Sequence, residues 1–282
     1  MRSICIFSHY YDLDLIPYYV IIYVKELKKY FDEIVLVTNS RNISNLNELP
    51  NEGIKIIKVK NEGYDMGMFY KAYKTIDASQ YSTIACINDS NILFGKLDFL
   101  FDWAEKQYLD FWGLMDADIK PSYSTNEKNY HIQSHFMVFN KKAIDLLPVY
   151  FDTIDLSSIF HQTDLKEVKR KVILQWEIGL SQFFIAKGLS AKSFVDHKEL
   201  TAEFQLPPST NISLTLYAQM IKRGIPLLKK KIVISVKPAI LLAGSDHWKN
   251  LIKKYSDREL DAPKLIQELS GIRLRHIRNK IL

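Results

Sequence analysis

The segment YSTIACINDSNILFG, residues 81–95, combines a predicted buried strand with an abrupt polar end. Residues 81–87 are rich in aromatic, β-branched and small apolar side chains, which is typical of a strand. The strand then stops on four small polar side chains, Asn88, Asp89, Ser90 and Asn91. Such residues at the carboxyl end of a strand indicate either an Asx-turn that caps the next segment or a binding site.

The first part of the chain repeats this pattern of strands that end in polar residues. Helical periodicity lies between the strands, and Pro17 is well placed to open the first helix. We predict strands at residues 2–10, 33–40, 53–59 and 81–89, and helices at residues 17–30 and 64–76. Strands that alternate with helices predict an open α/β sheet that binds its ligand along the carboxyl ends of the strands.

The second part of the chain is less regular but still contains strands and helices. Residues 109–115 and 131–140 are strand-like, and a helix that begins near residue 142 is expected to end or kink at Pro148. Residues 167–188 give the clearest helical pattern, with Gly188 as its C-terminal stop. Because no repeat or Gly/Ser-rich linker interrupts the sequence, we predict one domain over residues 1–235 and a helical extension over residues 236–282.

The composition is that of a folded globular protein. Of the 282 residues, 47% are hydrophobic and 25% are charged. No apolar run approaches the roughly 20 residues that span a bilayer, and no signal-peptide pattern precedes the first strand, so we expect a cytoplasmic protein. Cys5 and Cys86 lie in strand-like apolar runs, which favours buried reduced thiols over a disulfide or a metal site.

The net charge of +6 is concentrated in the last part of the chain. From Met220 onward there are 15 Lys or Arg and 5 Asp or Glu, which leaves the first 219 residues at −4. Residues 265–282 interleave apolar and basic side chains, a pattern that suits either an anionic membrane surface or a helix docked on the domain. Nucleic acid is not an expected partner, since no Gly-rich or aromatic RNA-binding motif accompanies the charge.

Two groups of residues could bind a phosphorylated ligand. Asp89 at the strand end could hold a divalent cation that bridges two phosphates, because hard cations prefer oxygen ligands. Gly63, Asp65 and Gly67 lie at the start of a predicted helix, where missing side chains and the helix N-terminus favour phosphate. This second group does not match the dinucleotide-binding fingerprint, whose third glycine is missing.

Eight short motifs carry a resemblance to a known family. They are FSHYY, VLVTNS, NEGYDMGMFYKAY, INDSNILFG, DFWGLM, HIQSHFMVFN, WEIGLSQFF and GIPLLKKKIV, within residues 3–235. In order and approximate spacing they resemble the rhamnan synthesis protein F family of bacterial glycosyltransferases, which assemble cell-surface polysaccharides. The resemblance implies a GT-A-like, Rossmann-type open twisted sheet, a nucleoside diphosphate sugar donor, a glycan or lipid-linked glycan acceptor, and inverting transfer of rhamnose or another hexose.

The resemblance also implies roles for individual residues. Asp89 corresponds to the acid that contacts the metal or the diphosphate, with Asn91 as a second metal ligand. The triplet Asp89-Ser90-Asn91 departs from the Asp-x-Asp often seen in GT-A enzymes, so the need for Mg²⁺ or Mn²⁺ stays open, and Asp116 with Asp118 is a weaker substitute. The residues expected to bind the donor are Ser8, His9, Tyr10, Asn39, Gly63, Asp65, Gly67, Lys71, Asn88, Asp89 and Ser90.

Glu177 resembles the family's glutamate on a late helix and is the candidate general base for inverting transfer. The alternative is a helix glutamate paired with Lys171 or Arg170. An extended segment at 131–135 would point His131, Gln133 and His135 one way, unless this is a solvent-facing strand side. We expect sugar contacts from this face, through His131 and Gln133, and from the neighbouring Ser134. Trp176 is either a sugar-stacking surface or a core residue.

Three further alternatives remain open from the sequence. Lys229, Lys230 and Lys231 could neutralise a departing diphosphate or form a solvated face. The whole protein could be a catalytically silent glycan-binding or scaffolding subunit of a polysaccharide assembly complex. It could also be a nucleotidyltransferase, which would release pyrophosphate where a glycosyltransferase releases a nucleoside diphosphate.

Overall fold

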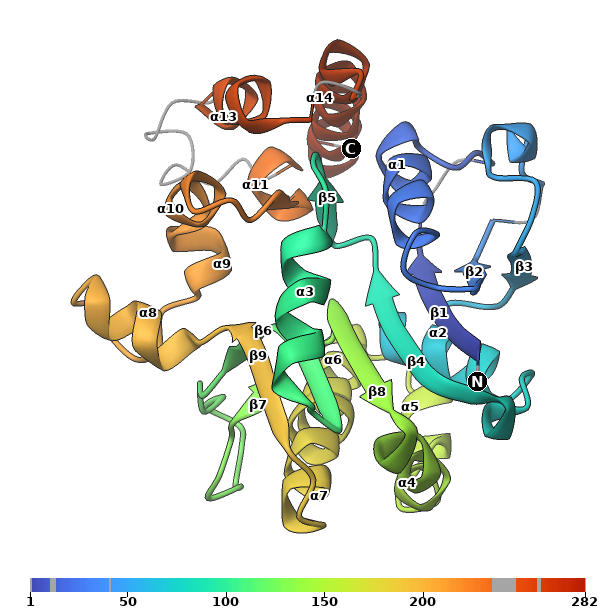
Figure 1. The fold of residues 1–282 in the computed structure, drawn as a ribbon, viewed down its shortest axis with the longest axis vertical. Coiled ribbons are helices and arrows are strands. Elements are labelled where there is room, and N and C mark those ends of the chain that lie inside the picture. Colours follow the sequence, from blue (N-terminus) through green and yellow to red (C-terminus); the bar gives the residue numbers. More distant parts are fainter. Residues whose placement is uncertain (1, 11–13, 41, 235–246, 258–259, 282) are drawn as a thin grey trace.

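The protein is built around a mixed sheet with helices on both faces (Figure 1). The computed structural model describes residues 2–10, 14–40, 42–234, 247–257 and 260–281, with residues 272–281 described as backbone. The eight-stranded sheet has the order β3-β2-β1-β4-β8-β6-β7, and β9 pairs with β6. Its strands are β1 (Arg2–His9), β2 (Glu33–Thr38), β3 (Ile54–Lys58), β4 (Tyr81–Asn88), β6 (Phe111–Ala117), β7 (His131–Ile132), β8 (Phe136–Asn140) and β9 (Ala191–Val195).

The helices follow in chain order. They are α1 (Tyr18–Leu27), α2 (Tyr64–Tyr73), α3 (Asp98–Gln107), α4 (Lys141–Phe151), α5 (Ser157–Phe160), α6 (Leu165–Lys171), α7 (Leu180–Ala186), α8 (His197–Glu203), α9 (Ile212–Thr215), α10 (Tyr217–Lys222), α11 (Lys230–Ile234), α13 (His247–Tyr255) and α14 (Ala262–Ile281). Short turns of 3₁₀ helix form η1 (Leu46–Glu48) and η2 (Ala78–Gln80), whereas η3 (Val172–Gly179) is a π-helix.

Strand pairing confirms the predicted open α/β sheet. The strands β3, β2, β1 and β4 run parallel, and β8 then lies antiparallel between β4 and β6. Because β1 and β4 are parallel, Ser8 pairs with Asn88 and the carboxyl ends of both strands meet at one edge. This edge is where a ligand is expected in such a fold.

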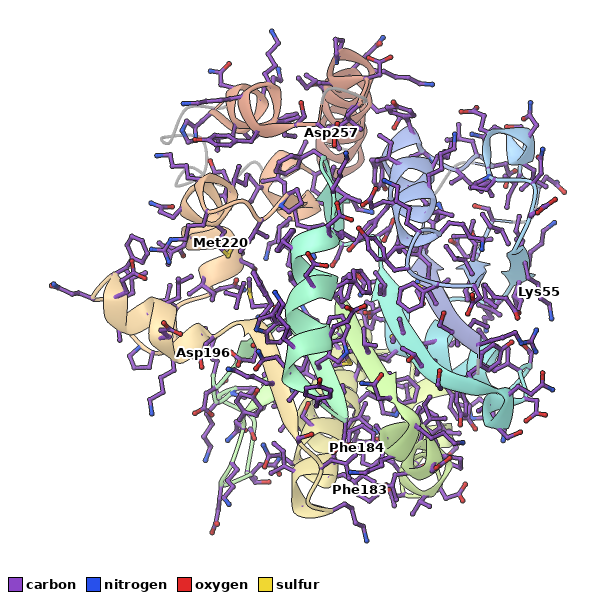
Figure 2. The ribbon with its side chains drawn as sticks, in the orientation of Figure 1. Lys55, Phe183, Phe184, Asp196, Met220 and Asp257 are labelled. Carbon is purple, nitrogen blue, oxygen red and sulfur yellow. The ribbon has the colours of Figure 1, made fainter. Side chains whose placement is uncertain are left out.

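Alternate residues of each central strand feed two apolar cores. On β1, Cys5 and Phe7 join one core and Ile4 and Ile6 join the other. The first core packs against α1, α3 and the C-terminal helices, and the second packs against α2, α4, η3 and α7. Figure 2 labels Phe183 and Phe184 on α7, and the ring of Phe184 lies 5.2 Å from that of Phe111 in the second core.

A small second sheet extends this edge. The strands β5 (Asn91–Leu93) and β10 (Leu227–Lys229) pair antiparallel, with Lys229 opposite Asn91. Backbone bonds continue the pairing on both sides, from Phe94 N to Pro226 O (3.0 Å) and from Lys230 N to Ser90 O (2.8 Å). A segment remote in sequence is therefore fixed against the polar end of β4.

Three predicted elements differ from the structure. The predicted helix at 167–188 consists of α6, η3 and α7, since a π-helix forms over Val172–Gly179. The predicted strand at 131–140 is broken by a turn at residues 134–135 into β7 and β8. Helix α4 continues through Pro148 to Phe151, because Pro148 lies in its last turn and removes only one hydrogen bond.

The C-terminal helices pack on the sheet domain. Leu265 and Leu269 of α14 and Ile252 of α13 are fully buried in the first core, and Figure 1 shows both helices beyond β5. No helix among the described residues is long and apolar enough to cross a bilayer. The basic side chains predicted to face a membrane, from Arg273 onward, lie outside the described side chains, so that proposal and the domain boundary at residue 235 stay predictions.

Candidate active site

A cavity of about 720 Å³ opens at the carboxyl ends of β1 and β4. We call it the cleft. Its walls come from the strand ends, the first turn of α2, the turn between β7 and β8, the helix pair α6–η3, and the end of β10. The lining residues are Ser8, Tyr10, Asn61, Tyr64, Asp65, Met68, Asn88, Asp89, Ser90, Gln133, Ser134, His135, Leu165, Lys169, Val172, Ile173, Glu177 and Lys229.

Asp89 is held by three donors at the edge of the cleft. Its Oδ2 lies 2.7 Å from Nζ of Lys230, 3.0 Å from Nδ1 of His9 and 3.3 Å from the hydroxyl of Tyr19. Burial raises the pKa of the Asp89 carboxyl, but the charge of Lys230 and the hydrogen bond from His9 outweigh burial and hold this pKa at about 2. Asp89 is therefore an ionised carboxylate whose Oδ2 atom accepts from three donors.

Asp65 and Glu177 are two further acidic residues that line the cleft. Burial, and then the negative charge of Glu177, raise the pKa of the Asp65 carboxyl. Asp65 accepts a hydrogen bond from Nδ2 of Asn88, which itself lies at the end of β4. Oε1 of Glu177 accepts a bond from the backbone N–H of Ser134 at 3.2 Å, so the turn between β7 and β8 orients the Glu177 carboxyl.

The alternative reading of Glu177 as an ion-paired helix residue is not supported. Arg170 pairs with Glu167 at 3.4 Å, and Nζ of Lys171 donates to the carbonyl of Ser158 at 3.2 Å. Across the described residues, no cation lies within 4 Å of Glu177. The carboxyl of Glu177 is half-buried and lines the cleft.

Lys229 brings a positive charge into the cleft. Its Nζ lies 3.3 Å from Oγ of Ser90. Burial lowers the pKa of the Lys229 ammonium to about 8, although the charges of Glu177 and Asp65 act in the opposite direction. His135 lines the same wall, and burial together with the charge of Lys229 lowers its pKa well below the usual value, which leaves the imidazole neutral at neutral pH.

The residues around Asp89 do not fit a divalent cation well. The two predicted ligands are Asp89 and Asn91, but Oδ2 of Asp89 already binds Lys230 and His9. Within the part of the chain that the structure describes, no group of three or more His, Cys, Asp or Glu side chains could hold a metal. Asp116 is no substitute, because its Oδ1 accepts the backbone N–H of His197 at 2.7 Å outside the cleft. The Mg²⁺ or Mn²⁺ site therefore stays a prediction that this geometry does not favour.

The cleft brings together many of the predicted site residues. Those that line it are Ser8, Tyr10, Asp65, Asn88, Asp89, Ser90, Gln133, Ser134 and Glu177. His9 lies behind this wall, where it is fully buried and bonded to Asp89. Asn39 and Asn91 do not line the cleft, although Asn91 is buried beside it on β5.

Three other predicted site residues lie outside the cleft lining, where they take part in backbone packing or an ion pair. At Gly67 an added Cβ would overlap the carbonyl oxygen of Glu62, so glycine allows close backbone packing at this position. Gly63 adopts a φ of 75° before α2, a conformation that suits glycine. Nζ of Lys71 binds Glu62 at 2.6 Å, and none of these three residues lines the cleft.

Trp176 and His131 are corrected in the same way. Trp176 is 1% exposed and packs against Tyr70 and Phe160 in the second core, so it is not a sugar-stacking surface. His131 is buried, and its Nδ1 lies 2.7 Å from the carbonyl of Asn129. The expected alternation over residues 131–135 fails because the segment turns at residue 134.

The sequence interpretation missed part of the cleft. Lys169 and Tyr64 line it without having been predicted, and Lys229 was predicted only together with Lys230 and Lys231, as a group that could neutralise a diphosphate or form a solvated face. For Lys169 the usable signal was its place two turns before Glu177 in the same helical segment. For Lys229, the only signal was an apolar tripeptide before a lysine, which does not reveal its strand partner.

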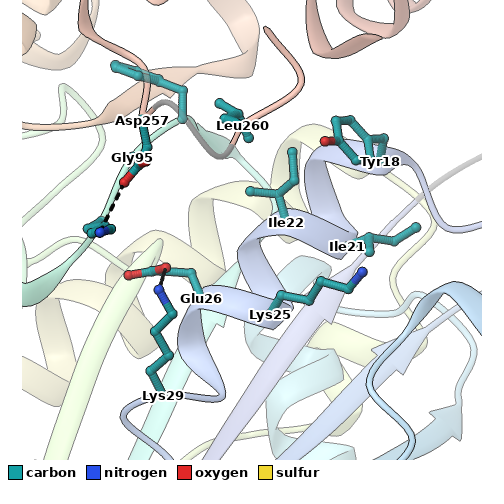
Figure 3. A pocket seen from close by; sticks show the side chains of 11 residues that line it. Tyr18, Ile21, Ile22, Lys25, Glu26, Lys29, Gly95, Asp257 and Leu260 are labelled. Atoms are coloured by element: carbon teal, nitrogen blue, oxygen red, sulfur yellow. Dashed lines mark hydrogen bonds and ion pairs between the residues drawn. The ribbon is translucent and has the colours of Figure 1, made fainter.

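A smaller pocket of about 300 Å³ lies between α1, the loop after β5 and the segment that contains Asp257 and Leu260 (Figure 3). Its charged side chains are largely paired: Lys29 binds Glu26 at 2.7 Å and Lys96 binds Asp257 at 3.5 Å. Glu26 also accepts the backbone N–H of Leu97 at 3.0 Å. These contacts connect α1 to the loop after β5 and give the pocket no group suited to catalysis.

Comparisons with known proteins were made for the whole chain. The model of one family, described as rhamnan synthesis protein F, matches residues 34–262, more than half of the chain. A virulence protein, VirA of Vibrio anguillarum, is 25% identical over 205 residues, which cover 63% of this chain. The chain spans 61% of the length of that curated relative.

Two solved structures are similar in chain course. The galactosyltransferase LgtC, solved with donor and acceptor sugar analogs, has a TM-score of 0.41 and 13% identity, covering 93% of this chain and 100% of that one. A 4-diphosphocytidyl-2C-methyl-D-erythritol synthase from Anaerococcus prevotii has a TM-score of 0.39 and 13% identity, covering 69% and 89%.

Proposed function

The chain belongs to the rhamnan synthesis protein F family, and from this premise we propose that it is a glycosyltransferase of cell-surface polysaccharide assembly. It moves a sugar, rhamnose or another hexose, from a nucleoside diphosphate to a growing or lipid-linked glycan. The proposal extends to a cytoplasmic enzyme working at the inner face of the membrane, where a lipid-linked acceptor would be presented.

One observation carries the proposal. Asp89 at the end of β4 and Glu177 on η3, far apart in sequence, line the same cavity. Its volume of about 720 Å³ is within the range for binding sites of small molecules and cofactors. Separate cavities for the two carboxylates would have left an attacking hydroxyl and a leaving diphosphate without a shared site.

The proposed reaction is a direct displacement at the anomeric carbon. Glu177 accepts the proton of the acceptor hydroxyl while the oxygen of that hydroxyl bonds to the anomeric carbon. The bond from carbon to the phosphate oxygen breaks, and the electron pair leaves with the nucleoside diphosphate. The sugar is transferred with inversion, and the proton on Glu177 returns to solvent after product release.

Donor binding is proposed for the strand-end side of the cleft. Ser8 lies near the end of β1 with Tyr10 just after it, and Asn88 ends β4 with Ser90 in the following turn, so these residues line the cleft at the edge where parallel strands end. Gln133 and Ser134 lie on the turn next to Glu177 and are proposed to contact the sugar or the acceptor.

The test is to identify the released nucleotide. The purified chain is incubated with a panel of nucleotide sugars and a glycan acceptor extract, and products are separated by chromatography. Release of a nucleoside diphosphate together with sugar incorporation supports the proposal. Release of pyrophosphate would instead identify a nucleotidyltransferase.

A catalytically silent scaffold gives a third outcome. It would bind a glycan without consuming any nucleotide sugar, and polysaccharide assembly in cells would survive replacement of Glu177. The half-buried carboxyl of Glu177, with no cation within 4 Å among the described residues, favours the enzyme over the scaffold.

A further inference from the structure

Lys229 occupies a position that the small second sheet fixes. It is the last residue of β10 and pairs with Asn91 of β5, and the next residue donates its backbone N–H to Ser90 at 2.8 Å. These bonds place the Lys229 side chain beside Ser90, with Nζ 3.3 Å from Oγ. Strand pairing and this hydrogen bond therefore hold the lysine against the polar turn that follows β4.

The two neighbouring lysines have different surroundings. Lys230 is paired with Asp89 at 2.7 Å and its Nζ lies 3.1 Å from the hydroxyl of Tyr19. Lys229 has no carboxylate oxygen within 4 Å among the described residues, and it lines the cleft. Lys231 is exposed. One lysine of the three thus presents an ammonium group to the cavity without a close counter-charge.

A bound anion would stabilise the charged form of the Lys229 side chain. Burial, and more weakly the charge of Lys231, lower the pKa of its ammonium to about 8 against the opposite effect of Glu177 and Asp65, so the charged form is costly there. An anion within contact distance would restore the charged form. Ser90 also lines the cleft, and its hydroxyl, which accepts from Nζ of Lys229, can donate its own hydrogen to a phosphate oxygen.

We propose that Lys229 binds the diphosphate of the sugar donor and supplies there the positive charge that a divalent cation supplies in other enzymes. Asp89 then serves to hold Lys230 and the strand-end turn in place. This assignment rests on the proposed function, because the diphosphate belongs to the donor. The ligand class is a nucleoside diphosphate, which is esterified to the sugar before transfer and free after it.

The test is a calorimetric titration of the full chain in EDTA with two probes, uridine or thymidine diphosphate and inorganic pyrophosphate. Lys229→Gln is expected to weaken binding of both probes about 10- to 100-fold, the contribution of one charge-assisted hydrogen bond. Lys229→Arg keeps most of the affinity. Lys222→Gln, at an exposed lysine at the end of α10 outside the cleft lining, is the control that binds like the wild type. Melting temperatures establish that each variant is folded.

The pH profile separates a charge on Lys229 from a structural role. Wild-type affinity for pyrophosphate is expected to fall between pH 7 and 9.5, because the ammonium loses its proton above about pH 8, whereas Lys229→Arg stays level. Equal affinity of Lys229→Gln and the wild type, or binding that disappears in EDTA and returns with Mg²⁺, overturns the assignment. Pyrophosphate binding that depends on Lys229, without any nucleotide preference, keeps the assignment and refutes the proposed donor.

Discussion

At the scale of single residues, three carboxylates in or beside one cavity differ because of what faces them. Asp89 is ionised by Lys230 and His9, which compensate for its burial. Asp65 has a raised pKa because it is buried close to Glu177. The carboxyl of Glu177 accepts the backbone N–H of Ser134, which is its one hydrogen bond among the described residues, and it lines the cavity. Glu177 is therefore the carboxylate that we propose to exchange a proton with the acceptor.

Replacing Glu177 by Gln should remove the general base while retaining the oxygen that accepts the Ser134 N–H. We expect kcat to fall about 10²- to 10⁴-fold, with the KM for the donor and the melting temperature near wild type. Steady-state kinetics with the identified donor measure both. Glu167→Gln on α6, outside the cleft lining, is the control and should retain full activity; a similar loss there would refute a specific role for Glu177.

Asp89 should make stability depend on pH in the acid range. Its pKa of about 2 lies below the ordinary 3.8, so the folded state favours the ionised form. This contribution is present above pH 4 and is lost as pH falls from about 4 to 2. It amounts to about 2 kcal/mol.

Chemical denaturation at a series of pH values can measure this contribution. Asp89→Asn is expected to unfold more easily at pH 7, since Lys230 loses its counter-charge. The difference in unfolding free energy between wild type and variant should shrink toward pH 2. A difference that stays constant with pH would show that Asp89 is not held ionised.

At the scale of elements, the π-helix η3 decides where Glu177 points. A π-helix shifts the following side chains around the helix axis relative to a regular α-helix, and such segments occur often at functional sites. Here the hydroxyl of Tyr150 on α4 donates to the carbonyl of Gln175, a group inside the wide turns. A Cβ at Gly179 would point at the same hydroxyl, so α4 and η3 pack closely at this point.

Gly179→Ala should therefore disturb the packing between η3 and α4. An added Cβ would collide with the Tyr150 hydroxyl and lie 3.0 Å from the carbonyl of Leu174. We expect a loss of about 1 to 3 kcal/mol in unfolding free energy and lower activity through displacement of Glu177. Combining it with Tyr150→Phe, which removes the colliding oxygen, should recover part of both; no recovery would locate the fault elsewhere.

At the scale of the whole molecule, the last helix is joined to the first. Leu265 and Leu269 of α14 are buried in the core that contains α1. Helix α1 has no side-chain cap of its own at Pro17. Glu268 of α14 accepts the backbone N–H groups of Tyr18 at 2.9 Å and Tyr19 at 3.4 Å instead.

Glu268→Ala should lower the unfolding free energy of the whole protein by about 1 kcal/mol, because two N–H groups at the start of α1 lose their acceptor. Glu268→Gln retains an oxygen acceptor and should lose less. Urea denaturation followed by circular dichroism provides the measurement. Identical midpoints for Glu268→Ala and the wild type would indicate that Glu268 of α14 does not stabilise α1. That result would be expected if α14 were an extension separate from the domain.

Much of the fold follows from local sequence patterns. Apolar runs with polar ends predicted β1, β2 and β4 and hence the binding edge, because a strand that is buried on both faces needs little more than its own composition to be recognised. The resemblance then indicated Glu177 and Asp89, and the structure places both on the lining of one cleft. Local patterns failed where packing with distant residues changed the backbone, as at the turn at residue 134 and in η3.

The sequence by itself determined the order of elements, the polar strand ends and the family. Only the tertiary structure decided which side chains meet. Trp176 became a core residue, Gly67 a packing contact, and Lys230 the partner of Asp89, while Lys229 turned toward the cleft. The physical reason is that charge and burial depend on neighbours brought together by β5–β10 pairing and helix packing, and neither has a signal at any single position along the chain.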